Sequence, residues 1–132
     1  GTEPGGQFTI PRELIKSVAN HFHNMADETI YESTFCCGGG GGLLTDDLME
    51  VRVKGALPRA TALSAVVKEH QVNFMATICA ICKAQFTKVL PKYGFDMSMV
   101  GGVHQLVAKA ILLEPGKPSE TEDQSELEAE TV

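Results

Sequence analysis

No apolar run in the chain approaches the roughly 20 residues that a membrane-spanning helix needs. Residues 1–6 have neither the positively charged region nor the apolar region of a secretory signal peptide. We therefore expect no direct membrane insertion and a cytoplasmic location. In that reducing compartment, clustered cysteines more often bind metal or act catalytically than form structural disulfides.

Basic residues are not in excess in the acidic tail or over the rest of the chain taken as a whole. The stretch 114–132 holds seven acidic residues and one lysine, which accounts for the full net charge of −6, and residues 1–113 carry equal numbers of acids and bases. A neutral folded part without a basic stripe argues against a nucleic-acid partner. A chain of 132 residues has room for one domain. We place this domain at 1–113 and a disordered acidic tail at 114–132.

Cysteine is scarce and confined to two compact clusters. Cys36 and Cys37 run directly into five glycines, and Cys79 and Cys82 form a Cys-x-x-Cys pair downstream. Thiols in such clusters are typical of ligands or redox partners rather than of packing. The glycines let the backbone pass close to whatever the sulfurs bind, and their N–H groups can donate hydrogen bonds to sulfur. These candidate cofactor-binding residues are Gly38, Gly39, Gly40, Gly41 and Gly42.

Hydrophobic periodicity predicts an alternation of helices and strands. The expected helices are 11–22, 58–70, 79–90 and 103–112, and the expected strands are 29–34, 72–78 and 96–100. Residues 45–55 are ambiguous between a short capped helix and a loop. Such an alternation indicates an α/β fold with an open, mostly parallel sheet flanked by helices.

This topology also suggests where the thiols meet. Ligands of open parallel sheets gather beyond the carboxyl ends of the strands. The Cys36-Cys37 pair, the Cys79/Cys82 pair and the Gly101-Gly102 pair each follow a predicted strand. We therefore expect all four sulfurs at one edge of the sheet.

Four thiolates at one edge are compatible with three kinds of site. An iron–sulfur cluster is normally held by thiolates, and hydrogen bonds to sulfur tune its potential. Zinc accepts four thiolates as well, although it more often uses two Cys-x-x-Cys knuckles than adjacent cysteines. A metal-free redox dithiol at 79–82 would leave the glycines unexplained. Nucleotide binding is disfavoured because no Gly-Lys-Ser/Thr follows the glycine run.

The Cys-Cys-Gly run followed by Cys-x-x-Cys resembles the cysteine-rich CCG domain of heterodisulfide reductases. That domain also occurs in iron–sulfur subunits of glycolate and lactate oxidation systems, which leaves an electron-relay role in hydroxyacid oxidation as an alternative. Three stretches, 3–8, 35–45 and 76–83, look closest to the DsrK branch. DsrK is the heterodisulfide-reductase-like subunit of the membrane redox complex of dissimilatory sulfur metabolism. The resemblance covers about residues 3–112.

The resemblance implies an oxidoreductase acting on sulfur groups. It implies a noncubane 4Fe–4S cluster as cofactor, with zinc as the alternative, and it matches Cys36, Cys37, Cys79 and Cys82 to the metal ligands. The implied substrate is a disulfide or trisulfide on a small DsrC-like sulfur-carrier protein. Electrons would be exchanged with the quinone pool through other subunits of the complex, which would attach this one peripherally to the inner membrane.

The sequence departs from the family pattern at one point. The pattern begins with a further cysteine before the Cys-Cys pair, and none precedes Cys36. We therefore expect the chain to be a C-terminal piece of a longer subunit, inactive when isolated. A secondary candidate is His104, which follows the glycines at the predicted edge and could donate a proton to a leaving thiolate. A solvent-exposed histidine near a helix start is the simpler interpretation.

Overall fold

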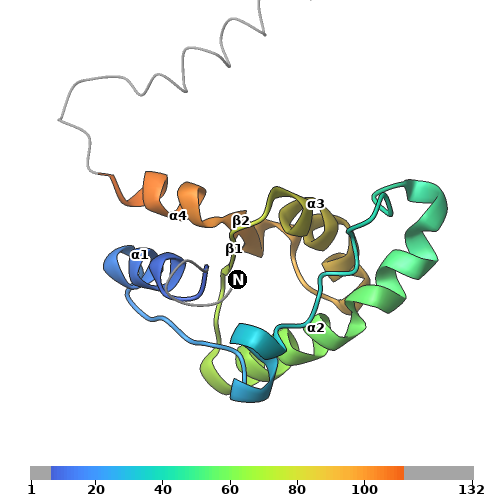
Figure 1. Ribbon diagram of the computed structural model, residues 1–132. Helices are drawn as coiled ribbons and strands as arrows, with labels where there is room; N and C mark the ends of the chain where they lie inside the picture. The colour runs from blue at the N-terminus through green and yellow to red at the C-terminus, as the bar shows by residue number, and fades with distance from the viewer. Residues whose placement is uncertain (1–6, 112–132) are drawn as a thin grey trace, which may run out of the picture.

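The computed structural model describes residues 7–111, so the predicted tail at 114–132 lies outside the described residues. Within that range, α-helices and two short strands are joined by loops and 3-10 turns (Figure 1). In chain order the helices and strands are α1 (Ile10–Val18), α2 (Met49–His70), β1 (Met75–Thr77), α3 (Ala80–Val89), β2 (Val100–Gly102) and α4 (Val103–Ala110).

The two strands form a small parallel sheet. Met75 pairs with Val100 and Thr77 with Gly102, while α3 makes the crossover from β1 to β2. Parallel strands need such a crossover, and a helix usually supplies it. The predicted α/β fold with an open parallel sheet flanked by helices is confirmed, although the sheet has two strands within residues 7–111 and not the three predicted.

The predicted strand at 29–34 is wrong. Two 3-10 turns, Asp27–Thr29 and Tyr31–Ser33, occupy this segment, and Tyr31 has a φ of +51°. A non-glycine residue in the left-handed region cannot continue an extended strand. The Tyr31 ring is held by contacts with the Phe8 ring, 5.5 Å between centroids, and with the Arg12 guanidinium at 4.5 Å. Tertiary contacts therefore outweigh the β propensity of this segment.

The long helix α2 begins earlier than predicted. The sequence places a helix start at Pro58, yet the helix already begins at Met49 and Pro58 lies inside it. A proline in a helix interior removes one backbone hydrogen bond. Packing on both sides offsets this loss, because Gly55 lies against the cysteine loop and the Tyr93 hydroxyl donates to the Val53 carbonyl in the same turn.

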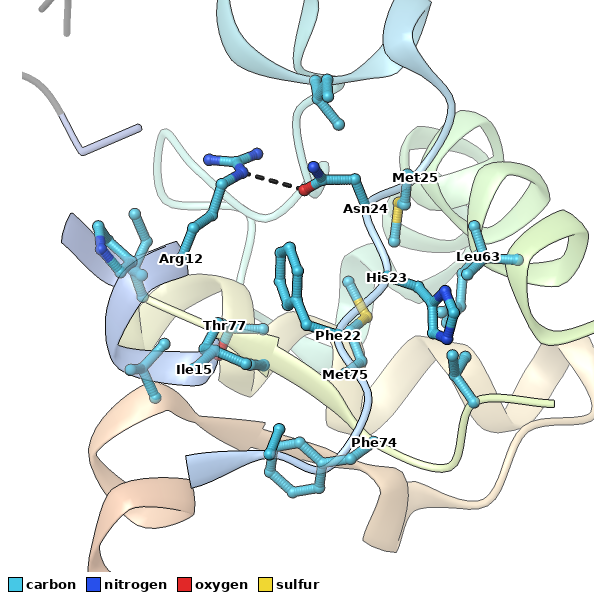
Figure 2. Close-up of a pocket in the computed structure, with 18 of the residues that line it drawn as sticks. Arg12, Ile15, Phe22, His23, Asn24, Met25, Leu63, Phe74, Met75 and Thr77 are labelled. Atoms are coloured by element: carbon cyan, nitrogen blue, oxygen red, sulfur yellow. Dashed lines mark hydrogen bonds between the residues drawn. The ribbon is translucent and has the colours of Figure 1, made fainter. Parts of the chain in front are cut away.

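Helix α1 is shorter than predicted, since it ends at Val18 and not at Phe22. Ala19 is extended, and no regular helix or strand follows before Asp27. This conformation lets Phe22 reach inward from an extended segment and not from a helix face, as Figure 2 shows.

The third predicted strand, 96–100, is displaced toward the carboxyl end of the chain. Met97–Met99 form a 3-10 turn, and the strand β2 includes Gly101 and Gly102, which the sequence assigned to a turn. A side chain at Gly101 would lie 2.6 Å from the Phe74 ring. The glycine therefore admits an aromatic ring directly over the strand.

The core lies where α2, α3 and the two strands meet. Its buried residues are Cys37, Ala56, Ala60, Leu63, Met75, Phe86, Val89, Leu90 and Val100. Helices α1 and α4 pack against each other beside the sheet (Figure 1). No helix within residues 7–111 has the length and apolar character needed to cross a membrane.

Candidate cysteine site

The Cys-x-x-Cys pair lies at the start of α3. Cys79 is the N-cap residue and is exposed, whereas Cys82 is half-buried in the first turn. The backbone N–H groups of Cys82 and then Ile81 lower the pKa of the Cys79 thiol below its usual range. Burial, followed by interactions with Cys37 and Cys79, raises the pKa of Cys82 to about 12. The pair therefore combines a thiol that ionises readily with one that resists ionisation.

Cys37 reaches this pair from a distant part of the chain. Its side chain is buried in the core, and it lies near enough to Cys82 to raise the pKa of that thiol. Its carbonyl accepts a hydrogen bond of 3.1 Å from Nε2 of Gln85, a side chain that is fully buried. Gln85 also donates to the Arg52 carbonyl at 3.1 Å and accepts from Nε of Arg52 at 2.8 Å. Gln85 thus fixes the cysteine loop against both α2 and α3.

The first two glycines of the run position this loop. Gly38 has a φ of +77°, and a Cβ there would lie 2.6 Å from the carbonyl carbon of Gly55. A Cβ on Gly39 would lie 2.8 Å from the Gln85 side chain. Residues 38 and 39 are therefore glycine because helices α2 and α3 approach the loop closely.

The rest of the run is open. Nothing lies within 4 Å of a Cβ built on Gly40, Gly41 or Gly42. The exposed Cys36 Sγ accepts a hydrogen bond from the Gly38 backbone N–H at 3.4 Å. This is one donor of the kind predicted for the glycine run, directed at sulfur.

A buried arginine that the sequence analysis missed lies beside the thiols. Arg59 is 6% exposed and donates to the carbonyls of Thr29 and Phe35 at 3.0 and 3.1 Å. Its other guanidinium nitrogen donates to Sδ of Met25. Burial lowers the pKa of Arg59, and the charge of Cys82 acts in the opposite direction.

A signal for this residue exists in the sequence. Arg52 and Arg59 share the buried face of α2 with Ala56 and Leu63. Two arginines at helical spacing on an apolar face are recognisable once the helix is known to start at Met49. With the helix predicted to start at Pro58, Arg52 lay outside it, and the buried face with two arginines could not be recognised.

Cys79, Cys82 and Arg59 all line a large cavity, of about 850 Å³. Most of the remaining wall is apolar, and Figure 2 shows Phe22 and Met75 directed into it. Nε of Arg12 donates to Oδ1 of Asn24 at 3.0 Å at another part of the wall. The cavity therefore offers space for a ligand beside the two thiols.

His104 does not share this cavity. It is exposed, at the second position of α4, and lines a separate and smaller hollow with Thr77 and Ile78. The structure thus brings Cys37 and Cys79 each next to Cys82, places Cys36 one residue away with its side chain exposed, and leaves His104 apart.

The donor chemistry fits an iron–sulfur group. Thiolates are the usual ligands of such groups, and the chain presents thiols from two segments at one place, with a backbone donor at the Cys36 sulfur. Within residues 7–111, no three His, Cys, Asp or Glu side chains are grouped closely enough to enclose a single metal ion. Zinc would use the same thiolates, so this geometry does not distinguish the zinc alternative from a cluster.

The opposite pKa directions predict selective alkylation of the metal-free chain. Iodoacetamide at pH 7 should modify Cys79 faster than Cys82, because the thiolate is the nucleophile and a lower thiol pKa leaves a larger fraction of the thiol ionised. The Cys82 rate should keep rising with pH and level off only near pH 12. Peptide mass spectrometry measures both rates, and the urea-unfolded chain is the control. Equal rates for the two cysteines in the folded chain would contradict the assignment.

No protein-family model matches the chain, and no solved structure matches it significantly. Two curated proteins do match over 108 residues, which is 82% of the chain. The chain is 42% identical to a protein of Archaeoglobus profundus named "Hdr-like menaquinol oxidoreductase iron-sulfur subunit". It is 37% identical to a protein of Archaeoglobus fulgidus named "Hdr-like menaquinol oxidoreductase iron-sulfur subunit 2".

The matched region spans 19% of the length of each of these relatives. Their names support similarity to a heterodisulfide-reductase-like iron–sulfur subunit, which is the broader part of the resemblance seen in the sequence. They do not single out the DsrK branch.

Proposed function

We propose that this chain forms the cysteine-rich domain of a heterodisulfide-reductase-like iron–sulfur subunit that transfers electrons between a quinol-linked complex and a disulfide. The proximity of Cys37 and Cys79 to Cys82, and the cavity that Cys79 and Cys82 line, carry the proposal. The similarity to proteins named as iron–sulfur subunits of menaquinol oxidoreductases supports it.

The proposed ligands are Cys36, Cys37, Cys79 and Cys82, and the proposed group is a 4Fe–4S cluster of the noncubane type. When bound, such a cluster would supply single electrons at a disulfide, whose cleavage takes up two electrons and two protons and gives two thiols. The chain's own groups prepare the site. Backbone N–H groups of α3 stabilise negative charge on Cys79, and the Gly38 N–H does so on Cys36.

The finer assignment is to the DsrK branch. In this proposal the substrate is a disulfide or trisulfide on a small DsrC-like sulfur-carrier protein, in dissimilatory sulfite and sulfur metabolism. The partners are the other subunits of a membrane redox complex, which hold the domain at the cytoplasmic face of the inner membrane. The 850 Å³ cavity beside Cys79 is compatible with a substrate segment entering from a partner protein.

A metal-free dithiol function is the second candidate, because the lowered pKa of Cys79 favours thiol–disulfide exchange. Activity measurements on the assembled complex distinguish the cluster-dependent function from the metal-free dithiol function. Replacing the half-buried ligand, Cys82→Ser, should reduce quinol-dependent disulfide cleavage to background, with Lys88→Ala on the exposed face of α3 as the control. Undiminished cleavage by the Cys82→Ser complex would contradict the proposed function. Disulfide cleavage with cysteine-dependent activity but no iron would favour the dithiol.

A further inference from the structure

Arg59 is a buried cation without an acidic partner. Its side chain lies in the interior, and its three hydrogen-bond acceptors are two carbonyl oxygens and one thioether sulfur, all neutral. Within residues 7–111, no carboxylate forms an ion pair with it. Burying an unpaired charge is costly, and buried charges in proteins are normally paired.

The second buried arginine of the same helix provides a contrast. Arg52 is also almost fully buried, but it forms an ion pair of 3.4 Å with Asp46 and lies away from the cavity. Arg59 instead lines the cavity that contains Cys79 and Cys82. The positive charge of Arg59 is therefore not neutralised by a carboxylate among the described residues, and it can stabilise negative charge on the thiols.

The same arginine also positions the cysteine loop. Its hydrogen bond to the Phe35 carbonyl lies one residue before Cys36, and its guanidinium lies 5.6 Å from the Phe35 ring centroid. The bond to the Thr29 carbonyl holds the preceding turn. Arg59 therefore cannot move away from the site without disturbing the segment that leads into the cysteines.

We propose that Arg59 is the counter-cation of the cysteine site: its unpaired charge stabilises negative charge on the thiol groups or on a group that they bind, and it favours anionic reaction partners at Cys79. This role rests on the proposed cysteine site but not on a bound cluster. Arg59 is therefore a positioning residue. It acts on the reacting groups through the electrostatic field of its charge and not by direct contact.

A charge-selectivity experiment tests the proposal on the metal-free chain. At fixed pH the thiols react with the dianionic 5,5′-dithiobis(2-nitrobenzoate) and, separately, with the neutral 2,2′-dithiodipyridine. In each reaction a protein thiolate displaces one arylthiolate and forms a mixed disulfide, so the released arylthiolate measures the rate. The ratio of the two rate constants removes the contribution of thiol accessibility and ionisation. Peptide mass spectrometry identifies the cysteine that has reacted.

The variants separate charge from structure. Arg59→Gln should lower the anionic-to-neutral ratio at Cys79 about tenfold, the size expected for one charge within roughly 10 Å at an effective dielectric constant of about 20. Arg59→Lys should retain most of the ratio, because it keeps the charge. Lys88→Gln, which removes an exposed cation that does not line the cavity, should leave the ratio unchanged.

Three results would overturn the proposal. The first is an unchanged ratio in Arg59→Gln, and the second is an equal loss in Arg59→Lys and Arg59→Gln, which would show a purely structural role. The third is an anionic-to-neutral rate ratio in the folded native chain that is no higher than in its urea-unfolded form. This measurement needs no variant, so it decides the question even if Arg59→Gln fails to fold.

In a chain reconstituted with the cluster, the reduction potential of the cluster provides a second measurement. A positive charge favours the reduced, more negative state, so Arg59→Gln should shift the oxidised-to-reduced ratio of the cluster at a fixed applied potential about tenfold toward oxidised, or 59 mV for one electron. Arg59→Lys should not. If the chain takes up no iron, the proposed function fails, while the charge-selectivity result still decides the role of Arg59.

Discussion

Replacing Gln85 with leucine should destabilise the chain by about 3 kcal/mol or more. Gln85 is fully buried and makes three hydrogen bonds, which join Cys37 to Arg52 and to α3. Leucine has a similar volume, so the loss comes from polar groups and not from a cavity. The Arg52 guanidinium loses its closest acceptor, and the Cys37 carbonyl is left buried without a donor.

Urea unfolding followed by circular dichroism measures this loss. Lys88→Leu is the matched control, since the same side chain is then introduced on the exposed face of the same helix, where we expect a change within about 0.5 kcal/mol. Alkylation of Cys37 in the folded state should also accelerate in Gln85→Leu, because its loop is released from α3. Equal stability of the two variants would show that Gln85 does not hold the cysteine loop.

Replacing Gly38 with alanine should cost about 3 kcal/mol as well, through a different mechanism. An L-residue in the left-handed region loses about 1–2 kcal/mol, and Gly38 has a φ of +77°. The added Cβ would also lie 2.6 Å from the backbone of Gly55, so either α2 or the loop must shift at a cost of about 1–3 kcal/mol. A shift of the loop would also move Cys37 relative to Cys82 on α3.

The glycine run contains its own control. Gly40 does not have a positive φ, and a Cβ there meets nothing within 4 Å. Gly40→Ala should therefore be neutral, or stabilise by up to about 1 kcal/mol through the lower entropy of the unfolded chain. Thermal unfolding of both variants is sufficient. A Gly38→Ala melting temperature equal to that of Gly40→Ala would refute the close packing of the loop on α2.

Local patterns predicted part of this fold. The helix after Cys79, the strand before it and the final helix follow from apolar periodicity and are present, with boundaries shifted by a few residues. The strand predicted at 29–34 fails because the Phe8 and Arg12 contacts hold Tyr31 at positive φ. Contacts between residues this far apart in the sequence are invisible to a local pattern.

The sequence predicted that all four sulfurs would lie at one edge of the sheet; the structure brings Cys37 next to Cys82, by a different route from the predicted one. The prediction relied on a strand before Cys36, and that strand is absent from the described residues. The actual route depends on contacts of Gly38 with Gly55 and of Cys37 with Gln85, over separations of 17 residues or more. Neither Gln85 nor Arg59 carries a motif, so only the three-dimensional packing reveals their part in the site.

The central claim is that these four cysteines hold an iron–sulfur cluster, and anaerobic reconstitution with iron and sulfide tests it most directly. Iron, sulfide and zinc are assayed per chain, and EPR spectra are recorded for the oxidised and reduced forms. The account predicts about four irons and four sulfides per chain with a paramagnetic state, since thiolates are the normal ligands of such clusters, and loss of iron in Cys37→Ser and Cys82→Ser. Zinc alone, or no metal in either this chain or a chain extended to the length of its relatives, would contradict it.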